Sequence, residues 1–254
     1  MGLDAEYSCG INQIRFMLSS AFLLIASYGA AVAATIAGFG SSALLIPVAF
    51  LFMDIKTAVF VVAVFHLFNN VFKIRLFWKS INFKIFLLFG IPSIIMAFAG
   101  AMLISVIPLE VVKIVLGVFL IVYAVYSFIK PEFGLKKSKP TAVVGGTLSG
   151  FLAGLIGLGG AIRGAFLTAF NLPKEIYVAT SAMIAVVIDT TRIPTYVLTK
   201  TVQDNSYYIL LPFLCVMAYF GVRTGKVLLK KINQDTFRRI VSIALFAVGV
   251  KILF

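Results

Sequence analysis

A carboxylate and an arginine lie three residues apart inside a long apolar stretch of this sequence. Of the nine acidic residues in the chain, only Asp189 lies well inside such a stretch, and Arg192 follows it within one helical turn. An ionisable group in apolar sequence is costly to bury, so it marks a candidate functional site. The pattern indicates either a proton-coupling carboxylate or an ion pair that only orients the arginine, and both interpretations stay open.

Cationic side chains in or beside apolar sequence are candidates for binding an anion. A guanidinium group suits this best, because its planar fork matches two oxygens of a sulfonate, sulfite or carboxylate. We expect Arg192 and Arg163, which lies beside a glycine-rich segment, to contact a solute. Lys73 and Arg223 are expected to extend toward lipid head groups instead.

Hydroxyl and amide side chains interrupt the same apolar stretches. They could donate hydrogen bonds to a solute, yet such residues also hold membrane helices together at about 0.6 kcal/mol each. We place three of them in the predicted solute site and regard two more as weaker candidates: Asn70, Thr180 and Ser181, then Asn69 and Thr190.

Two glycine-rich segments, 38–42 and 157–160, each precede a short apolar stretch. Glycine permits close backbone approach, and the N–H groups at the start of a following helix favour an anion. The alternative is tight helix packing, which we expect for the glycines at 146, 150 and 154. The predicted solute-binding residues of the two segments are Gly38, Gly40, Ser41, Ser42, Gly157, Gly159 and Gly160.

The composition places these residues in a membrane protein. Hydrophobic residues make up 61% and charged residues 12% of 254 residues, and the mean hydropathy is +1.09. The net charge of +13 lies in short basic connections, which indicate membrane topology rather than nucleic-acid binding. Two cysteines form no disulfide framework, and no metal-binding, cofactor or HExxH and GxSxG enzyme motif occurs. We therefore expect neither an enzyme nor a cofactor or metal.

Ten apolar stretches follow one another along the chain. Those at 43–53 and 161–170 are too short to span, because about eleven helical residues rise only some 16 Å. The others are long enough for full spans: 14–37, which we expect to be retained rather than cleaved, 57–78, 83–107, 111–128, 141–156, 176–198, 207–229 and 237–254.

The chain is predicted to contain two copies of one unit. An offset of 119 residues, the difference between 157 and 38, places Gly38 on Gly157, and also Asn70 on Asp189 and Lys73 on Arg192. His66, the single histidine, falls on Ala185 under this offset, so a structural role is favoured over proton relay. The predicted units are 1–129 and 141–254, joined by a basic cytoplasmic linker at 130–140.

The basic connections indicate how the units are oriented. They lie at 73–84, 130–139 and 226–239, and short cytoplasmic loops carry excess Lys and Arg. All three face the cytoplasm only if the chain turns back at each glycine break, so that the short segments re-enter. This predicts an all-α integral membrane protein with eight full spans, two short re-entrant segments, inverted repeats and both termini outside.

The motif AGFGSSALLIPVAFLF at 37–52, its echo GLIGLGGAIRGAFLTAFNLP at 154–173 and the two-unit layout resemble the sulfite exporter TauE/SafE family of membrane permeases. The resemblance covers nearly the whole chain. It implies a plasma-membrane (inner-membrane) multi-pass permease for sulfite, sulfonates or related anions, without an ATPase domain, and places the family's glycine signature on the two breaks. Serines in the first break and Arg163 after the second depart from the family pattern, which leaves the particular substrate open.

These observations favour a secondary transporter of small anions, such as sulfite, organosulfonate or a related oxyanion. It would work by alternating access, coupled to protons or another ion through Asp189, with the solute near mid-membrane between the two breaks. The partners are a small anionic solute and the lipid bilayer, with no nucleic acid. An anion channel is the main alternative, ahead of a membrane-embedded assembly factor or enzyme. The anion, direction, coupling ion and oligomeric state are left open.

Overall fold

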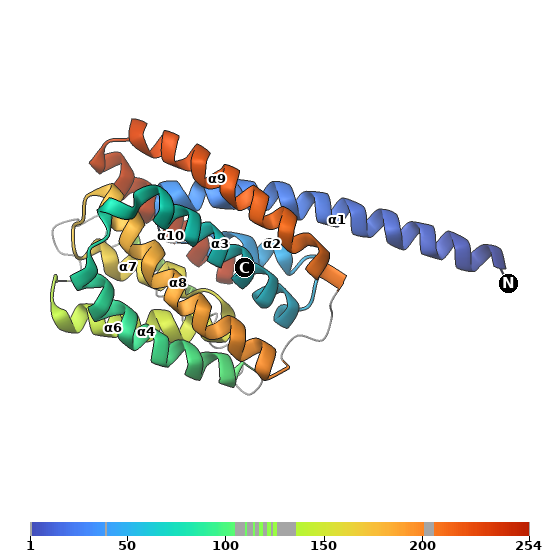
Figure 1. Ribbon diagram of the computed structural model, residues 1–254, viewed down its shortest axis with the longest axis horizontal. Coiled ribbons are helices and arrows are strands. Elements are labelled where there is room, and N and C mark those ends of the chain that lie inside the picture. The colour runs from blue at the N-terminus through green and yellow to red at the C-terminus, as the bar shows by residue number, and fades with distance from the viewer. Residues whose placement is uncertain are drawn as a thin grey trace.

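The computed structural model describes residues 2–38, 40–104, 136–200 and 206–253, together with positions 110, 114, 117–118, 121–122 and 124–125. The described chain is helical throughout, which confirms the all-α prediction (Figure 1). In order, the elements are α1 (Gly2–Ala37), α2 (Ser42–Ala49), α3 (Ile55–Phe77), η1 (Trp78–Ser80), α4 (Phe83–Leu103), α6 (Lys139–Ile156), α7 (Gly159–Thr168), α8 (Lys174–Leu198), η3 (Ser206–Leu210), α9 (Leu211–Lys231) and α10 (Gln234–Leu253).

Within the described ranges, five helical segments are long and apolar enough to cross a membrane. They are Met17–Ala37, Lys56–Ser80, Phe83–Leu103, Lys174–Leu198 and Tyr207–Lys231. Helices α6 and α10 form where spans are expected but are not among these five, and most of the expected span at 111–128 lies outside the described residues. The structure therefore supports a multi-pass membrane protein with five candidate spans.

The outer surface is apolar and the interior holds polar groups. Ile25, Ile95 and Leu198 are 73%, 63% and 82% exposed, whereas Asn69 and Asp189 are fully buried. A soluble protein rarely exposes so much large apolar side-chain surface, but lipid is a good solvent for it. The polar interior is therefore where function is expected.

Polar residues at the helix starts fix where the helices begin. The Asp54 carboxylate accepts hydrogen bonds from the backbone N–H groups of Lys56 and Thr57 at the start of α3. The Asn82 side chain caps α4 and the Ser138 hydroxyl caps α6 in the same way. Each cap satisfies backbone N–H groups that have no partner within the helix.

Two pairs of parallel helices pack through small residues. In α6, a Cβ on Gly146, Gly150 or Gly154 would overlap with backbone carbonyls of α4, at Phe89, Ser93 and Ala97 respectively, which confirms the predicted close-contact face. In α9, a Cβ on Gly221 or Gly225 would lie 2.5 or 2.6 Å from side-chain atoms of Ala31 and Thr35 in α1. Close approach of this kind is how helices gain packing energy in a membrane.

Helix α3 lies at the centre, against α8 and α9 (Figure 1). It runs parallel to α9, because the rings of Phe72 and Tyr219 lie 5.4 Å apart and the Lys226 Nζ donates to the Leu76 carbonyl at 2.8 Å. It runs antiparallel to α8, since Asn82, just after α3, donates its N–H to the Thr180 hydroxyl near the start of α8. Helix α4 also packs on α8.

These directions bring three lysine-rich connections to one end of the molecule, which we call the basic end. It contains the α3–α4 connection with Lys79, the start of α6 with Lys136, Lys137 and Lys139, and the end of α9 with Lys230 and Lys231 (Figure 1). The start of α8 lies there too, because the Lys174 Nζ donates to the Leu229 carbonyl at 2.9 Å.

The chain reverses direction at both glycine breaks. After α1 and α2, the Phe52 ring returns to within 5.8 Å of the Phe22 ring near the beginning of the first candidate span. Helix α7 likewise runs back along α6, since the Ser149 hydroxyl donates to the Gly159 carbonyl and Phe166 lies against Gly145. Both short helices therefore run toward the end from which the preceding long helix came.

Candidate functional site

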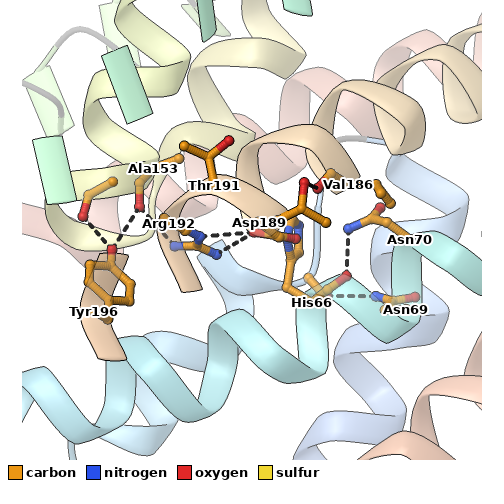
Figure 2. A network of polar contacts seen from close by, with 12 residues as sticks. His66, Asn69, Asn70, Ala153, Val186, Asp189, Thr191, Arg192 and Tyr196 are labelled. Carbon is orange, nitrogen blue, oxygen red and sulfur yellow. Dashed lines mark hydrogen bonds and ion pairs between the residues drawn. The ribbon is translucent and has the colours of Figure 1, made fainter. Parts of the chain in front are cut away.

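A buried carboxylate links the two central helices near their midpoints. Asp189 Oδ1 on α8 accepts from Arg192 Nε at 2.9 Å and Nη2 at 2.8 Å, so the two side chains form an ion pair. Its other oxygen, Oδ2, lies 2.7 Å from the Nδ1 of His66 on α3 (Figure 2). All three residues are at most 3% exposed. The carboxylate therefore has one cation on one oxygen and an imidazole on the other.

Arg192 also reaches the end of α6. Its Nη1 donates to the Ala153 carbonyl at 2.8 Å, and the Tyr196 hydroxyl bonds to the neighbouring Gly154 carbonyl (Figure 2). These carbonyls belong to the last turn of α6, just before the second break, and the Ala153 carbonyl also accepts from the Gly157 N–H at 3.0 Å. The arginine thus ties α8 to the break.

Lys73 makes the corresponding contact in the first half of the chain. Its Nζ donates to the Ala34 carbonyl at 3.2 Å, just before the first break, and the side chain is 2% exposed. The prediction that Lys73 extends to lipid head groups was wrong, because α3 turns this face toward α1. Arg223 matches its prediction: it is exposed, with its Nη1 on the Tyr219 hydroxyl at 3.0 Å.

The two breaks meet beside Arg163. The Arg163 Nε on α7 donates to the Ser181 hydroxyl on α8 at 3.0 Å. A Cβ placed on Gly40 would lie 2.8 Å from His66 Nε2, 3.3 Å from Arg163 Nη2 and 3.6 Å from the Gly160 Cα. The backbone of one break, the backbone of the other and two nitrogen-bearing side chains therefore converge on one point.

Amide side chains of α3 complete the cluster. Asn69 Nδ2 donates to the Ser41 hydroxyl at 2.6 Å, at the start of α2, and Asn70 Nδ2 donates to the His66 carbonyl at 2.7 Å (Figure 2). Two buried polar atoms of α3, His66 Nε2 and Asn69 Oδ1, have no hydrogen-bond partner among the described residues. Buried polar atoms without a hydrogen-bond partner are unusual in a native interior, and they are expected where a ligand supplies the missing partner.

Glycine is required at both breaks. Gly38 and Gly157 have φ of +76° and +75°, a left-handed conformation that other residues rarely adopt. Gly38 lies against the ring of Tyr177, whereas a Cβ on Gly157 would lie 3.2 Å from Arg192 Nη1. Gly159, in the second break, is the first residue of α7.

Some predicted solute contacts lie away from this point. The Thr180 hydroxyl accepts from the Asn82 N–H near the basic end, and Thr190 is exposed and bonds to carbonyls of its own helix. Ser42 is buried in the first turn of α2. Thr180 and Thr190 therefore support helix packing and helix geometry instead.

Sequence reasoning underrated His66 and omitted Tyr177 and Tyr196. The His66 imidazole contacts Asp189. The Tyr177 hydroxyl donates to the Gly164 carbonyl of α7, and the Tyr196 hydroxyl donates to the Gly154 carbonyl of α6. The available signal was a histidine at the middle of an apolar stretch, and comparison with its repeat position Ala185 obscured it.

The buried charges of the described residues are unequal in sign. Lys73, Arg163 and Arg192 are buried cations, and Asp189 is the buried acid. When the lysine, both arginines and the aspartate all carry their usual charges, two positive charges are in excess, since three cations oppose one carboxylate. Buried positive charge is costly, so an anion beside these cations would be stabilised. Within the described ranges, no group of three His, Cys, Asp or Glu side chains could hold a metal ion.

Comparison with known proteins agrees with this chemistry. The family model described as Sulfite exporter TauE/SafE matches residues 23–252. A comparison with curated proteins finds no match.

Proposed function

Because this chain belongs to the sulfite exporter TauE/SafE family of membrane transporters, we propose that it is a secondary transporter of a small sulfur oxyanion such as sulfite or a sulfonate. Members of this family are transporters and not enzymes. The proposal concerns the substrate, the site and the mechanism, which the family membership alone leaves unassigned.

One observation carries the proposal: His66 Nε2 and Arg163 Nη2 converge on Gly40, where the two breaks meet, inside a cluster with excess positive charge. An oxyanion at this point would accept hydrogen bonds from the guanidinium group and lie beside the N-terminal turn of α7, whose helix dipole favours negative charge. It would also compensate the charge excess. An anion therefore supplies what the buried cluster lacks.

The proposed mechanism is alternating access around this point. His66 is the middle residue of α3, and Asp189 lies near the middle of α8, so the cluster belongs near the midplane of the membrane. The residues around Gly40 are buried, as expected of a carrier with its site closed to both sides, whereas an open channel would expose them to water.

We further propose that 1–129 and 141–254 are inverted repeats joined by a linker at 130–140. The left-handed glycines at 38 and 157 match under the offset of 119, and so do the bonds from Lys73 to Ala34 and from Arg192 to Ala153. When each helix is replaced by its counterpart in the other half, the α1–α9 contact becomes α6–α4, and the α3–α9 contact becomes α8–α4. All four of these helix pairs pack against each other in the structure. Helix α1 runs toward the basic end and α6 away from it, as inversion requires.

The remaining topology follows from charge. The positive-inside rule assigns the basic end to the cytoplasm, which places the reversing helices α2 and α7 as re-entrant segments from opposite faces. The membrane would be the plasma membrane.

Counterflow into proteoliposomes tests the proposed function. Vesicles preloaded with unlabelled sulfite, thiosulfate, sulfoacetate or acetate would take up the labelled form of the same anion, at equal pH on both sides. Saturable exchange of sulfur oxyanions, with weaker exchange of acetate, is the expected result. Flux that does not saturate and shows no counterflow would indicate a channel, and absence of exchange by folded protein would overturn the proposal.

A further inference from the structure

The bond to Asp189 fixes which nitrogen of His66 carries a proton. Asp189 Oδ1 already accepts from both Arg192 nitrogens, so the carboxylate is ionised and acts as an acceptor only. The 2.7 Å contact with Oδ2 therefore requires a hydrogen on His66 Nδ1. In the neutral ring, Nε2 then bears the lone pair, and a second proton can bind only there.

The unprotonated nitrogen, His66 Nε2, faces the proposed anion site beside Gly40. His66 Nε2 is buried, has no hydrogen-bond partner within the part of the chain that the structure describes, and lies 2.8 Å from the Cβ position of Gly40. A lone pair repels the oxygens of an anion at this position, whereas a protonated Nε2 donates a hydrogen bond to them. The anion and the proton would therefore occupy adjacent places and each would stabilise the other.

We infer that His66 Nε2 is the proton site of this transporter, so that one proton binds with each anion and crosses the membrane with it. The inference rests on the proposed anion site. The proton comes from water on one side, binds the Nε2 lone pair, and returns to water on the other side, so no covalent bond is made or broken beyond the N–H bond.

Asp189 is a positioning residue in this account rather than the proton carrier. Both of its oxygens are engaged, and a proton on either would break a bond to Arg192 or to His66. The proposal also explains why the histidine occurs in only one half of the chain. A single proton site per anion needs one imidazole, and the repeat position of His66 holds Ala185.

The charged and titratable groups around His66 come from several helices. Asp189 and Arg192 face it from α8 and Arg163 faces it from α7. Farther along α3 lies Lys73, and α9 places Tyr219 and Lys226 against the last turns of α3. Helix α2 contributes no titratable side chain. An anion beside Arg163 offsets nearby positive charge, so anion binding and proton binding are reciprocally coupled.

The test uses thiosulfate, whose charge stays constant where histidine titrates, in the proteoliposomes described above. An inward gradient of one pH unit, with the membrane potential held at zero, should concentrate thiosulfate about tenfold if one proton accompanies each anion. A pH-sensitive dye inside the vesicles should report one proton entering per anion.

His66→Gln provides the matched variant, since glutamine is similar in size and does not titrate. It should lose the gradient-driven accumulation and the proton uptake, and its remaining exchange should be independent of pH. If His66 had only a structural role, exchange and gradient-driven accumulation would fall in the same proportion. If the variant fails to fold, a wild-type count of no proton per anion still overturns the proposal.

The outcomes separate the two proposals. Thiosulfate exchange at equal pH without accumulation under a gradient would overturn the proton site and leave the anion site standing. Absence of thiosulfate exchange in folded protein, alongside absence of sulfite exchange, would overturn both.

Discussion

Replacing Gly40 by alanine should lower transport at least tenfold while leaving the protein folded. Gly40 has φ of +128°, where a residue with a side chain costs of order 1–3 kcal/mol. The added methyl group would lie 2.8 Å from His66 Nε2, so the imidazole must move and weaken its bond to Asp189. A hydrogen bond to a charged group contributes about 1.5–3 kcal/mol, and 1.4 kcal/mol is a tenfold change in affinity.

The assay is sulfite counterflow together with thermal unfolding in detergent. We expect exchange by Gly40→Ala to fall at least tenfold, because the methyl group also occupies the proposed place of the anion. Gly29→Ala is the matched control, since nothing lies within 4 Å of its Cβ position and alanine is a better helix former. Gly159→Ala should differ from both by failing to fold, because its Cβ would overlap with the Ser149 carbonyl. Wild-type exchange by a stably folded Gly40→Ala protein would refute the reasoning.

Three further substitutions test the electrostatics and the packing. Asp189→Asn should destabilise the protein by about 3–5 kcal/mol, because it leaves Arg192 buried without its carboxylate, and an unchanged unfolding temperature would contradict this. Gly154→Ala should cost about 1–3 kcal/mol by forcing α6 away from the Ala97 carbonyl of α4, again measured by thermal unfolding. Arg223→Ala should lower stability by less than about 1 kcal/mol and leave counterflow unchanged, since this arginine is exposed and contacts Tyr219 of its own helix.

The glycine breaks could be predicted from the sequence because their signal is local. A glycine-rich segment followed by an apolar stretch too short to span leaves few alternatives, and both breaks contain a left-handed glycine at the expected position. The contact face of α6 was predictable for the same reason, since glycines four residues apart lie on one side of a helix.

The contacts at the centre of the site could not be predicted from a local sequence pattern. His66 and Asp189 are 123 residues apart in the sequence, so no local pattern joins them. The position of Lys73 depends on which face of α3 turns inward, and the low amphipathicity of an apolar helix leaves that face undetermined in the sequence. His66 and Asp189 acquire their roles from the crossing of α3 and α8.

Sulfite counterflow by Arg163→Gln tests the central claim most directly, with Arg223→Ala as the control for loss of a cation elsewhere. Arg163 is the guanidinium nearest the point where the breaks meet, and Arg223 lies on the outer surface of α9. The account predicts that Arg163→Gln raises the sulfite concentration for half-maximal exchange at least tenfold, whereas Arg223→Ala exchanges like the wild-type protein. Equal exchange by both variants and the wild-type protein would contradict an anion site between the two breaks.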